Sequence, residues 1–322
     1  MIDVLYIAGA GRSGSTLLER LLGQLSGAVA VGELRHLWRE NPESWRCGCG
    51  ELLTDCSFWL EVSRRASLPL TATTFNDIQQ TQRVVDRIRY VPSMLVLPLT
   101  SRAWQARHAN YVAILRRLYE AIQEASQASV IVDSSKDIST LYLLSRMNDV
   151  RLRLLHLVRD SRAVAYSWTK EIVRPHKVDE VSYMGIYSPQ WSAADWMYRN
   201  TLSTLASSLA DRYMRLRYED FIADPSGTLR RVADFMDLPD ADPGFVGPNE
   251  VRLARATHTV AGNPMKFQQG NLRIRLDAAW QHALPQRDRR LVTALTWPLL
   301  WRYGYPLSTP AASEGAAAGQ AK

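Results

Sequence analysis

The feature that most constrains the fold is a glycine-rich segment, residues 9–16 (GAGRSGST), which directly follows an apolar stretch at residues 4–8. Residues 16–25 continue with leucines at helical spacing. A strand that enters a helix through such a turn presents backbone N–H groups and the partial positive charge of the helix N-terminus. The segment therefore predicts an anion-binding loop in an α/β fold, with a plain glycine–serine turn as the alternative.

This loop departs from the Walker A pattern of nucleoside triphosphatases. Gly9 and Gly14 have the required spacing, but Ser15 stands where the pattern demands Lys. That Lys neutralises the β- and γ-phosphates, so its loss disfavours a triphosphate. Arg12 supplies another cation within the loop. We predict that the loop holds one phosphate or sulfate through Arg12, Ser13, Gly14, Ser15 and Thr16.

The rest of the chain alternates short apolar strands with helical segments. The predicted strands are 28–31, 130–132, 152–158 and 213–217, and the predicted helices are 163–172, 191–209 and 228–236. This alternation predicts a mostly parallel sheet in one α/β domain, residues 1–306. Residues 75–128 have helical periodicity, broken by prolines, and we expect them to form an insertion near the acceptor site. We expect the low-complexity tail, 307–322, to be disordered.

A second anion site is predicted at the end of strand 152–158. Arg159 follows this strand directly, and the carboxyl ends of parallel strands are where α/β sheets bind ligands. Ser167 lies eight residues on, about two turns into the next helix. The two side chains can converge on a phosphate. The alternative is that Arg159 pairs with Asp160 or a helix end.

Composition and charge narrow the function classes. The 322 residues are 46% hydrophobic and carry a net charge of +7, which suits an anionic ligand. There is no run of five Lys or Arg residues, so we expect no nucleic-acid partner. We see neither a signal-peptide pattern nor an apolar run long enough to span a bilayer, and we expect a cytoplasmic protein without a membrane span.

The three cysteines are too few for a disulfide scaffold. Cys47 and Cys49 form a C-x-C pair, and Cys56 follows seven residues later. Three thiols can ligate zinc if a fourth ligand lies elsewhere. No neighbouring C-x-x-C or H-x-x-x-H completes such a set, so we favour a structural or redox-active loop over a metal site.

Two segments together resemble the PAPS-dependent sulfotransferases, most closely the bacterial, carbohydrate and tyrosylprotein branches. Residues 11–16 (GRSGST) and 156–167 (HLVRDSRAVAYS) carry the resemblance, and 217–221 (RYEDF) and 258–264 (HTVAGNP) extend it. It implies a P-loop-type three-layer sandwich around a mostly parallel five-stranded sheet. It also implies transfer of a sulfuryl group from PAPS to a hydroxyl or amine, with release of PAP.

The resemblance assigns the donor-binding residues. The first loop would bind the 5′-phosphosulfate, and Arg159 and Ser167 would bind the 3′-phosphate. Tyr218 matches a cofactor-contacting tyrosine of the tyrosylprotein branch. Asn263 and Lys266, in and after the late segment, are further candidates for phosphate contacts.

The resemblance also suggests catalytic groups. Glu33, in GELR, resembles the general base, with a helix N-terminal role as the alternative. Lys136, in DSSKD, resembles the lysine that stabilises the leaving phosphate, and Arg12 would stabilise the transition state. His258 is an alternative base. Because a sulfuryl group carries less charge than a terminal phosphate, we expect no obligatory metal.

Several questions stay open at this stage. Glu171 stands where the tyrosylprotein branch has Arg, so the resemblance does not imply a protein acceptor. A small-molecule, carbohydrate or lipid acceptor would suit the aromatic residues Trp104, Tyr111, Tyr183, Tyr187 and Trp191. The rival hypotheses are a P-loop small-molecule kinase, with Asp133 in the magnesium-binding position, and a non-catalytic nucleotide-binding module. A homodimer is left open.

Overall fold

The computed structural model describes residues 1–174, 181–238 and 244–308. Its centre is a five-stranded sheet in the order β2-β3-β1-β4-β7, and every neighbouring pair is parallel. The strands are β1 (Ile2–Ala8), β2 (Ala28–Gly32), β3 (Val130–Lys136), β4 (Val150–Val158) and β7 (Arg212–Arg217). The predicted five-stranded parallel sheet is confirmed.

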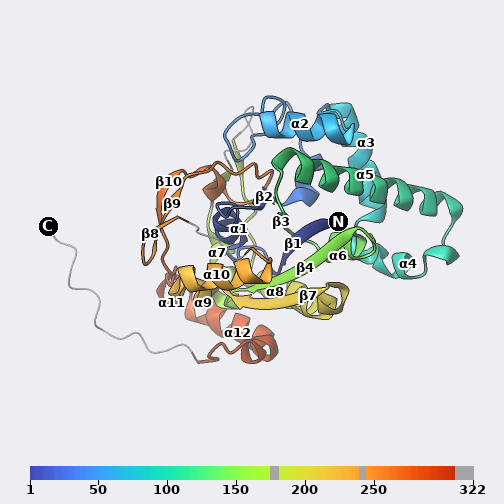
Figure 1. The fold of residues 1–322 in the computed structure, drawn as a ribbon. Helices are drawn as coiled ribbons and strands as arrows, with labels where there is room; N and C mark the ends of the chain where they lie inside the picture. Colours follow the sequence, from blue (N-terminus) through green and yellow to red (C-terminus); the bar gives the residue numbers. More distant parts are fainter. Residues whose placement is uncertain (175–180, 239–243, 309–322) are drawn as a thin grey trace.

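Strand β1 shows why helices cover both faces of this sheet. Val4 and Tyr6 point into one hydrophobic core, and Leu5 and Ile7 point into a second core on the other face. A parallel strand that is apolar on both sides requires two covering layers. The first core is closed by α2 (Ser57–Ala66), α3 (Ala72–Val85), α5 (Arg102–Ser126) and α6 (Ile138–Ser145), and the second by α1 (Ser15–Leu22), α9 (Tyr218–Ala223) and α10 (Pro225–Phe235). With the sheet, these helices make the three layers visible in Figure 1.

The helices on the first face come mainly from one segment. They are α2 (Ser57–Ala66), α3 (Ala72–Val85), α4 (Val91–Leu95) and α5 (Arg102–Ser126), with α6 (Ile138–Ser145) after β3. Pro92 and Pro98 begin short turns of helix between α3 and α5, because proline is tolerated in a first helical turn. Figure 1 shows α2, α3 and α5 lying together along one side of the sheet.

Of the remaining helices, some close the second core and the others pack beside β4. They are α1 (Ser15–Leu22), α7 (Ser161–Thr169), α8 (Pro189–Leu205), α9 (Tyr218–Ala223), α10 (Pro225–Phe235), α11 (Trp280–Ala283) and α12 (Gln286–Arg302). Helices α7, α8 and α12 pack on one another around Trp196. None of the helices in the described part of the chain is long and apolar enough to cross a membrane.

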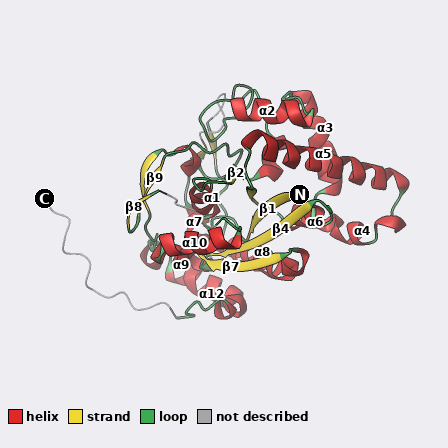
Figure 2. Ribbon diagram, viewed as in Figure 1, coloured by secondary structure: helices red, strands yellow, loops and turns green. Residues whose placement is uncertain are grey.

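A small antiparallel sheet extends the second face (Figure 2). It is formed by β8 (Phe245–Gly247), β9 (Glu250–Leu253) and β10 (Gly270–Arg273), and Val251 and Leu272 join the core under α1. A further pair, β5 (Val173–Arg174) and β6 (Ser182–Tyr183), lies after α7. The predicted disordered tail falls outside the described residues from 309 onward.

Candidate active site

The glycine-rich loop fits between β4 and a tyrosine ring. At Gly9, where φ is 130°, a Cβ atom would lie 2.2 Å from the carbonyl oxygen of Leu157. At Gly14, where φ is 90°, it would lie 2.5 Å from the ring of Tyr218. Both positions therefore require glycine. The loop leads directly into α1, so the backbone N–H groups of the helix N-terminus lie at the end of the loop.

Arg12 is the cation of this loop. It adopts a left-handed backbone conformation (φ 63°), and its guanidinium lies 4.6 Å from the ring centre of Trp168. Nη1 donates to Met184 Sδ over 3.0 Å, while Nε and Nη2 are buried without a partner among the described residues. Burial and the charges of Arg174 and Arg159 lower its pKa to about 10, so Arg12 stays charged at neutral pH. A buried cation with free donors fits an anionic ligand.

Arg159 joins the second motif to the first. Its guanidinium lies 4.6 Å from the ring centre of Tyr218, and Nη1 donates to the carbonyl oxygen of Arg12 over 3.1 Å. Asp160 is not its partner, because that carboxylate caps α7 and pairs with Arg162 at 2.7 Å. The carboxylate of Asp277 lies 3.8 Å from Arg159 Nη2. Arg159 thus lies beside the loop, as the two-motif hypothesis requires.

One cavity of about 1090 Å³ collects most of the predicted residues. Its lining includes Arg12, Gly14, Ser15, Thr16, Glu33, Lys136, Arg159, Ser167, Tyr218 and Asn263. Ser13 is the exception: it is buried beneath the loop, and its Oγ has no partner among the described residues. Ten of the described lining residues are Arg or Lys and five are Asp or Glu, so the cavity favours an anion.

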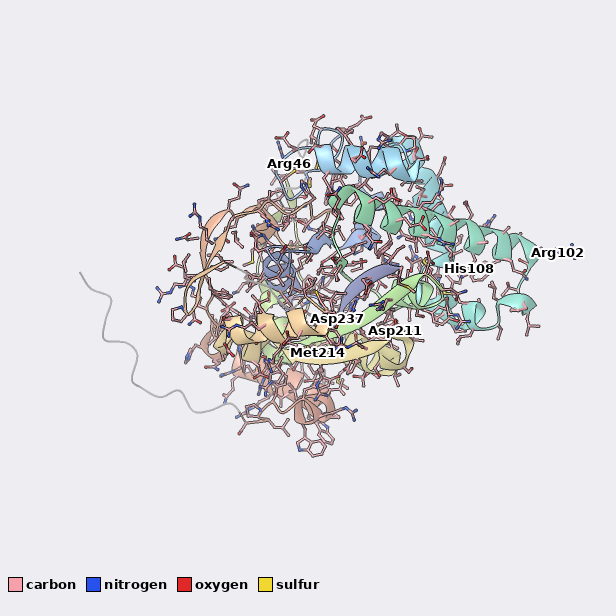
Figure 3. The ribbon with its side chains drawn as sticks, viewed as in Figure 1. Arg46, Arg102, His108, Asp211, Met214 and Asp237 are labelled. Carbon is pink, nitrogen blue, oxygen red and sulfur yellow. The ribbon has the colours of Figure 1, made fainter. Side chains whose placement is uncertain are left out.

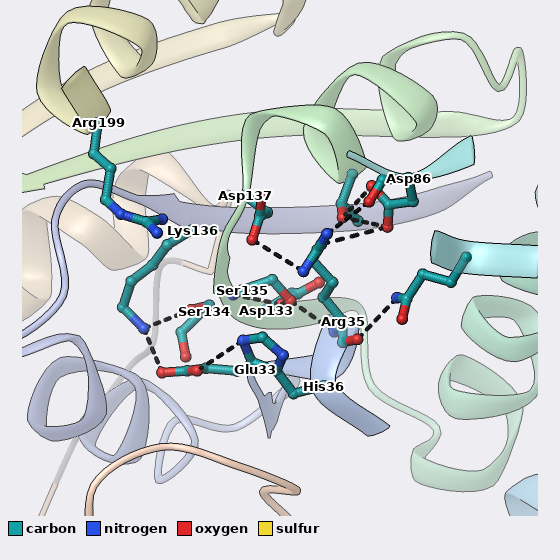
Figure 4. A network of polar contacts seen from close by, with 12 residues as sticks. Glu33, Arg35, His36, Asp86, Asp133, Ser134, Ser135, Lys136, Asp137 and Arg199 are labelled. Atoms are coloured by element: carbon teal, nitrogen blue, oxygen red, sulfur yellow. Dashed lines mark hydrogen bonds and ion pairs between the residues drawn. The ribbon is translucent and has the colours of Figure 1, made fainter. Parts of the chain in front are cut away.

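Glu33 and Lys136 meet because the neighbouring strands β2 and β3 end side by side (Figure 4). Lys136 Nζ donates to Glu33 Oε1 over 2.6 Å and to the carbonyl oxygen of Ser134 over 2.9 Å. Lys136 also has a left-handed backbone (φ 64°). His36 Nε2 lies 3.6 Å from the second oxygen of Glu33. Two of the three predicted catalytic residues, Glu33 and Lys136, therefore form one ion pair at the cavity wall.

This ion pair controls the ionisation of Glu33. Burial opposes ionisation, but the charges of Lys136, His36 and Arg174 and the hydrogen bond from Lys136 together lower its pKa to about 2. Glu33 is therefore a carboxylate at neutral pH. A carboxylate of so low a pKa is a weak base, and it gains basicity when Lys136 turns to another partner.

Sequence reasoning missed the charged groups around this pair. Arg35 lies 3.5 Å from Asp86 and 3.3 Å from Asp137, and its backbone N–H donates to Ser135 Oγ over 3.0 Å. Arg199 points toward Lys136 from α8, and both arginines line the cavity (Figure 4). The sequence could have indicated Arg35, because it lies two residues after Glu33 in the GELR segment. Nothing in the sequence marks Arg199 as a site residue, because it lies in an ordinary helical pattern.

Asp133 has a structural role in this network. Its Oδ2 accepts the hydroxyl of Tyr119, and its Oδ1 accepts the backbone N–H and the hydroxyl of Ser135. Burial raises its pKa to about 6, against the effect of these donors. Asp133 is not among the described residues that line the cavity. A kinase would need this carboxylate to bind magnesium beside the nucleotide, so the buried position of Asp133 argues against the kinase hypothesis.

The late segment lies over α1 and the loop. The backbone N–H of Asn263 donates to Thr16 Oγ1 over 3.3 Å, while its side chain caps the following turn of helix (Pro264–Phe267). Lys266 is buried and donates to the carbonyl oxygens of Arg46, Thr259 and Val260, so it is not the phosphate contact we considered.

His258 faces away from the cavity. Its Nδ1 lies 3.3 Å from Cys56 Sγ and 3.7 Å from Cys47 Sγ, and its ring stacks on Phe58 at 4.7 Å. It is not among the described residues that line the cavity. The geometry therefore favours Glu33 over His258 as the base.

Aromatic side chains form part of the cavity wall. Tyr187 stacks on Trp191 with ring centres 4.0 Å apart, and Trp168 meets Tyr187 edge-on at 4.9 Å. All three line the cavity.

Two other aromatic residues considered for the acceptor site lie within the helical layer of α3 and α5 instead. Trp104 donates a hydrogen bond to the carbonyl oxygen of Val84, and Tyr111 donates one to the carboxylate of Asp86. No described residue from 75–128 lines the cavity; Asp86 of that segment pairs with Arg35, which does line it.

Comparisons with known proteins agree on one family. Residues 5–242 match the model of the Sulfotransferase family. No curated protein sequence matched the chain significantly. Similar solved structures include the sulfotransferase domain from the curacin biosynthetic pathway, with 16% identity, a TM-score of 0.51, and coverage of 96% of this chain and 99% of that one.

Another similar structure is the sulfotransferase domain from the Synechococcus PCC 7002 olefin synthase, with 20% identity, a TM-score of 0.46, and coverage of 94% and 96% of the two chains. At these identities the curacin-pathway structure supports the fold. The family assignment rests on the family model, because it matches well over half of the chain, including the glycine-rich loop, the three catalytic candidates and Arg159. This protein therefore belongs to the sulfotransferase family of enzymes.

Proposed function

We propose that the protein moves a sulfuryl group from PAPS to a hydroxyl group of a small-molecule, carbohydrate or lipid acceptor and releases PAP. One observation carries the proposal: two guanidinium groups from separate motifs, Arg12 and Arg159, meet beside the Glu33–Lys136 pair in one cavity. PAPS supplies a sulfuryl group that is already activated by its bond to phosphate.

The residues present fit this donor. Arg12 offers two buried nitrogens without protein partners among the described residues, and the N-terminus of α1 offers backbone donors; both suit the 5′-phosphosulfate. Arg159 and Ser167 line the same cavity and would hold the 3′-phosphate. The ring of Tyr218 lies against the guanidinium of Arg159 on one side and packs closely on Gly14. Tyr218 would therefore set the distance between the two anion sites.

Glu33 and Lys136 would divide the chemistry between them. Glu33 takes the proton of the acceptor hydroxyl as its oxygen attacks sulfur, and Lys136 donates a hydrogen bond to the bridging oxygen that leaves with PAP. In the free protein these groups neutralise each other. When Lys136 turns to the bridging oxygen, Glu33 loses its nearest cation, and its pKa rises from about 2.

The aromatic wall suggests how the acceptor enters. Trp168, Tyr187 and Trp191 line the cavity, and Trp191 is also exposed. Such rings favour acceptors with an apolar or ring-shaped face next to the reacting hydroxyl. We further propose a cytoplasmic protein, since free cysteines suit a reducing compartment.

The direct test incubates the purified protein with PAPS and a panel of sugars, phenols, sterols and lipid alcohols. Mass spectrometry would identify a product heavier by one SO₃ group, and chromatography would measure PAP in equal amount. Product from the wild type and none from Glu33→Gln or Lys136→Ala supports the proposal. Phosphate transfer from MgATP, or PAP binding without turnover on any acceptor, would favour the rival hypotheses.

A further inference from the structure

Three cysteines and one histidine converge away from the cavity. The Sγ atoms of Cys47, Cys49 and Cys56 and a ring nitrogen of His258 all lie within 4.8 Å of one another. The sequence could not supply the fourth ligand, because His258 lies about two hundred residues beyond the cysteines. We propose that these four residues bind one structural Zn²⁺ ion, contrary to our preference for a metal-free loop.

The spacing of the ligand atoms matches a tetrahedral zinc site. Zn–S bonds of about 2.3 Å and Zn–N bonds of about 2.05 Å give edges of about 3.8 Å between sulfurs and about 3.6 Å between sulfur and nitrogen. Cys49 and Cys56 have their sulfurs 3.7 Å apart. The Nδ1 atom of His258 lies 3.7 Å from the Cys47 sulfur and 3.3 Å from that of Cys56.

A disulfide or plain core packing fits the cluster less well than zinc does. A disulfide needs sulfurs about 2.05 Å apart, and it would leave the third thiol and the imidazole without a role. Plain core packing does not require an imidazole nitrogen to point at two sulfurs. Four protein ligands close the coordination shell, so the site is structural rather than catalytic.

The surrounding groups hold the ligands in place. The backbone N–H of Cys47 donates to Glu51 at 2.8 Å, and that of Cys56 donates to Leu52 at 2.9 Å. Trp59 Nε1 donates to the carbonyl oxygen of His258 at 3.0 Å, and Phe58 stacks on the imidazole. Such supporting contacts fix ligand orientation in metal sites.

Charge balance also fits zinc. Zn²⁺ with three thiolates and a neutral imidazole carries a net charge of about −1. The buried ammonium of Lys266 lies next to the cluster, since it donates to the carbonyl oxygens of Arg46 and Thr259, the neighbours of Cys47 and His258. This explains why a lysine is buried there at all.

The site joins two parts of the chain that are far apart in sequence. Gly48 donates to Thr259 at 2.9 Å, Val260 donates to Val31 at 3.0 Å, and Asn263 donates to Thr16 at 3.3 Å. The ion would therefore fasten the late segment against the end of β2 and against the start of α1. This role does not depend on the identity of the donor.

The first test measures metal in the full chain, purified without chelators from zinc-replete cells, by inductively coupled plasma mass spectrometry. We expect about one Zn²⁺ per chain. His258→Ala and Cys56→Ser should lose most of it, whereas His282→Ala, at an exposed histidine in α11, should keep it. Absence of zinc from the wild type, or iron in its place, would overturn the proposal.

Two measurements on the wild type remain decisive if those variants fail to fold. Replacement by Co²⁺ should give the intense visible absorption of tetrahedral cobalt bound to thiolates, and octahedral cobalt spectra would contradict the proposal. A thiol reagent should react with all three cysteines only after chelation. A single reactive thiol would instead reveal a disulfide and overturn it.

Hydrogen exchange then tests the fastening role. After zinc removal, the amides of residues 257–263 should exchange at least tenfold faster, while those of β1 and β4 stay protected. Equal protection of residues 257–263 with and without zinc would show that the ion does not hold this segment.

Discussion

At the scale of single residues, the site concentrates backbone strain at two of its cations. Arg12 and Lys136 are among the described non-glycine residues with positive φ, and both line the same cavity. Each such conformation costs about 1–3 kcal/mol and persists only where the surroundings enforce it. The strain directs a guanidinium and an ammonium into the place where negative charge would collect.

Arg159 should contribute a large share of donor affinity. Arg159→Ala removes a buried cation that lies beside Arg12, so we expect PAP binding to weaken by about 1.5–3 kcal/mol, or about 10- to 150-fold. Isothermal titration calorimetry measures this. The control is Arg102→Ala, whose side chain lies at the outer end of α5 (Figure 3). Unchanged PAP affinity in Arg159→Ala would rule out the second anion site.

Glu33 should matter for turnover rather than for donor binding. Glu33→Gln keeps the size of the side chain but cannot take a proton, so we expect kcat to fall about 10²- to 10⁴-fold with PAP affinity within a few-fold of wild type. Glu43→Gln, at an exposed position, should behave as wild type. A kcat within twofold of wild type in Glu33→Gln would exclude it as the base.

The same residue makes a prediction about pH. Its pKa of about 2 lies below its ordinary value of 4.5, so Glu33 is already ionised throughout the usual assay range. The kcat/KM profile of the free enzyme should therefore show no acidic limb from Glu33 between pH 4 and 7. An acidic limb near pH 6 that disappears in Glu33→Gln would show that the Lys136 pair is absent in solution.

At the scale of elements, the sequence predicted secondary structure best where the residue types allow only one local backbone conformation. The loop, β1, β3, β4 and α7 were predictable because glycines, an apolar run and an Arg-Asp turn each favour one local structure. Helix α12 was missed because Pro298 lies inside it and its apolar residues do not form one face. Strands β8–β10 were missed because they are short and half exposed.

The loop's glycines allow a matched comparison. Gly14→Ala places a methyl group 2.5 Å from the Tyr218 ring at φ 90°, whereas Gly270→Ala has a similar φ of 79° with open space around it. Both should lose about 1–3 kcal/mol to backbone strain. Only Gly14→Ala should also lose PAP affinity, by displacing Tyr218. Denaturant unfolding and calorimetry measure the two effects. Equal PAP affinity in both variants would contradict the proposed role of Tyr218.

Strand β4 carries a buried histidine, His156, that forms a hydrogen bond with Asn200 of helix α8. Burial lowers the pKa of His156 to about 4, although its Nε2–H donates a 2.8 Å hydrogen bond to Asn200 Oδ1, which favours the charged form. The unfolded chain takes up this proton near pH 6.5 and the folded chain does not, so stability falls as pH drops from 6.5 to 4, by about 3 kcal/mol.

Unfolding free energy measured from pH 4 to 7 tests this dependence. His156→Gln should be less stable at pH 7 but should show a shallower loss toward pH 4, whereas His282→Gln should follow the wild type. Parallel curves for the wild type and His156→Gln would show that His156 does not stay neutral in the fold.

At the scale of the whole molecule, the central sheet explains why distant motifs act together. The carboxyl ends of β1, β2, β3 and β4 bring the loop, Glu33, Lys136 and Arg159 to one edge, a meeting that follows from parallel topology and could be predicted from sequence. The pairing of His258 with the cysteines could not be predicted, because it depends on how the late segment returns across the fold. The net charge of +7 indicated an anionic ligand, and the cavity concentrates that charge.

The most direct test of a two-anion donor site is the binding of three nucleotides by calorimetry: PAP, 5′-AMP and MgATP. A cavity with two anion sites, one of them at Arg159, should bind PAP at least tenfold more tightly than 5′-AMP, which lacks the 3′-phosphate, and more tightly than MgATP. Equal affinity for PAP and 5′-AMP, or a preference for MgATP, would contradict a site built for PAPS.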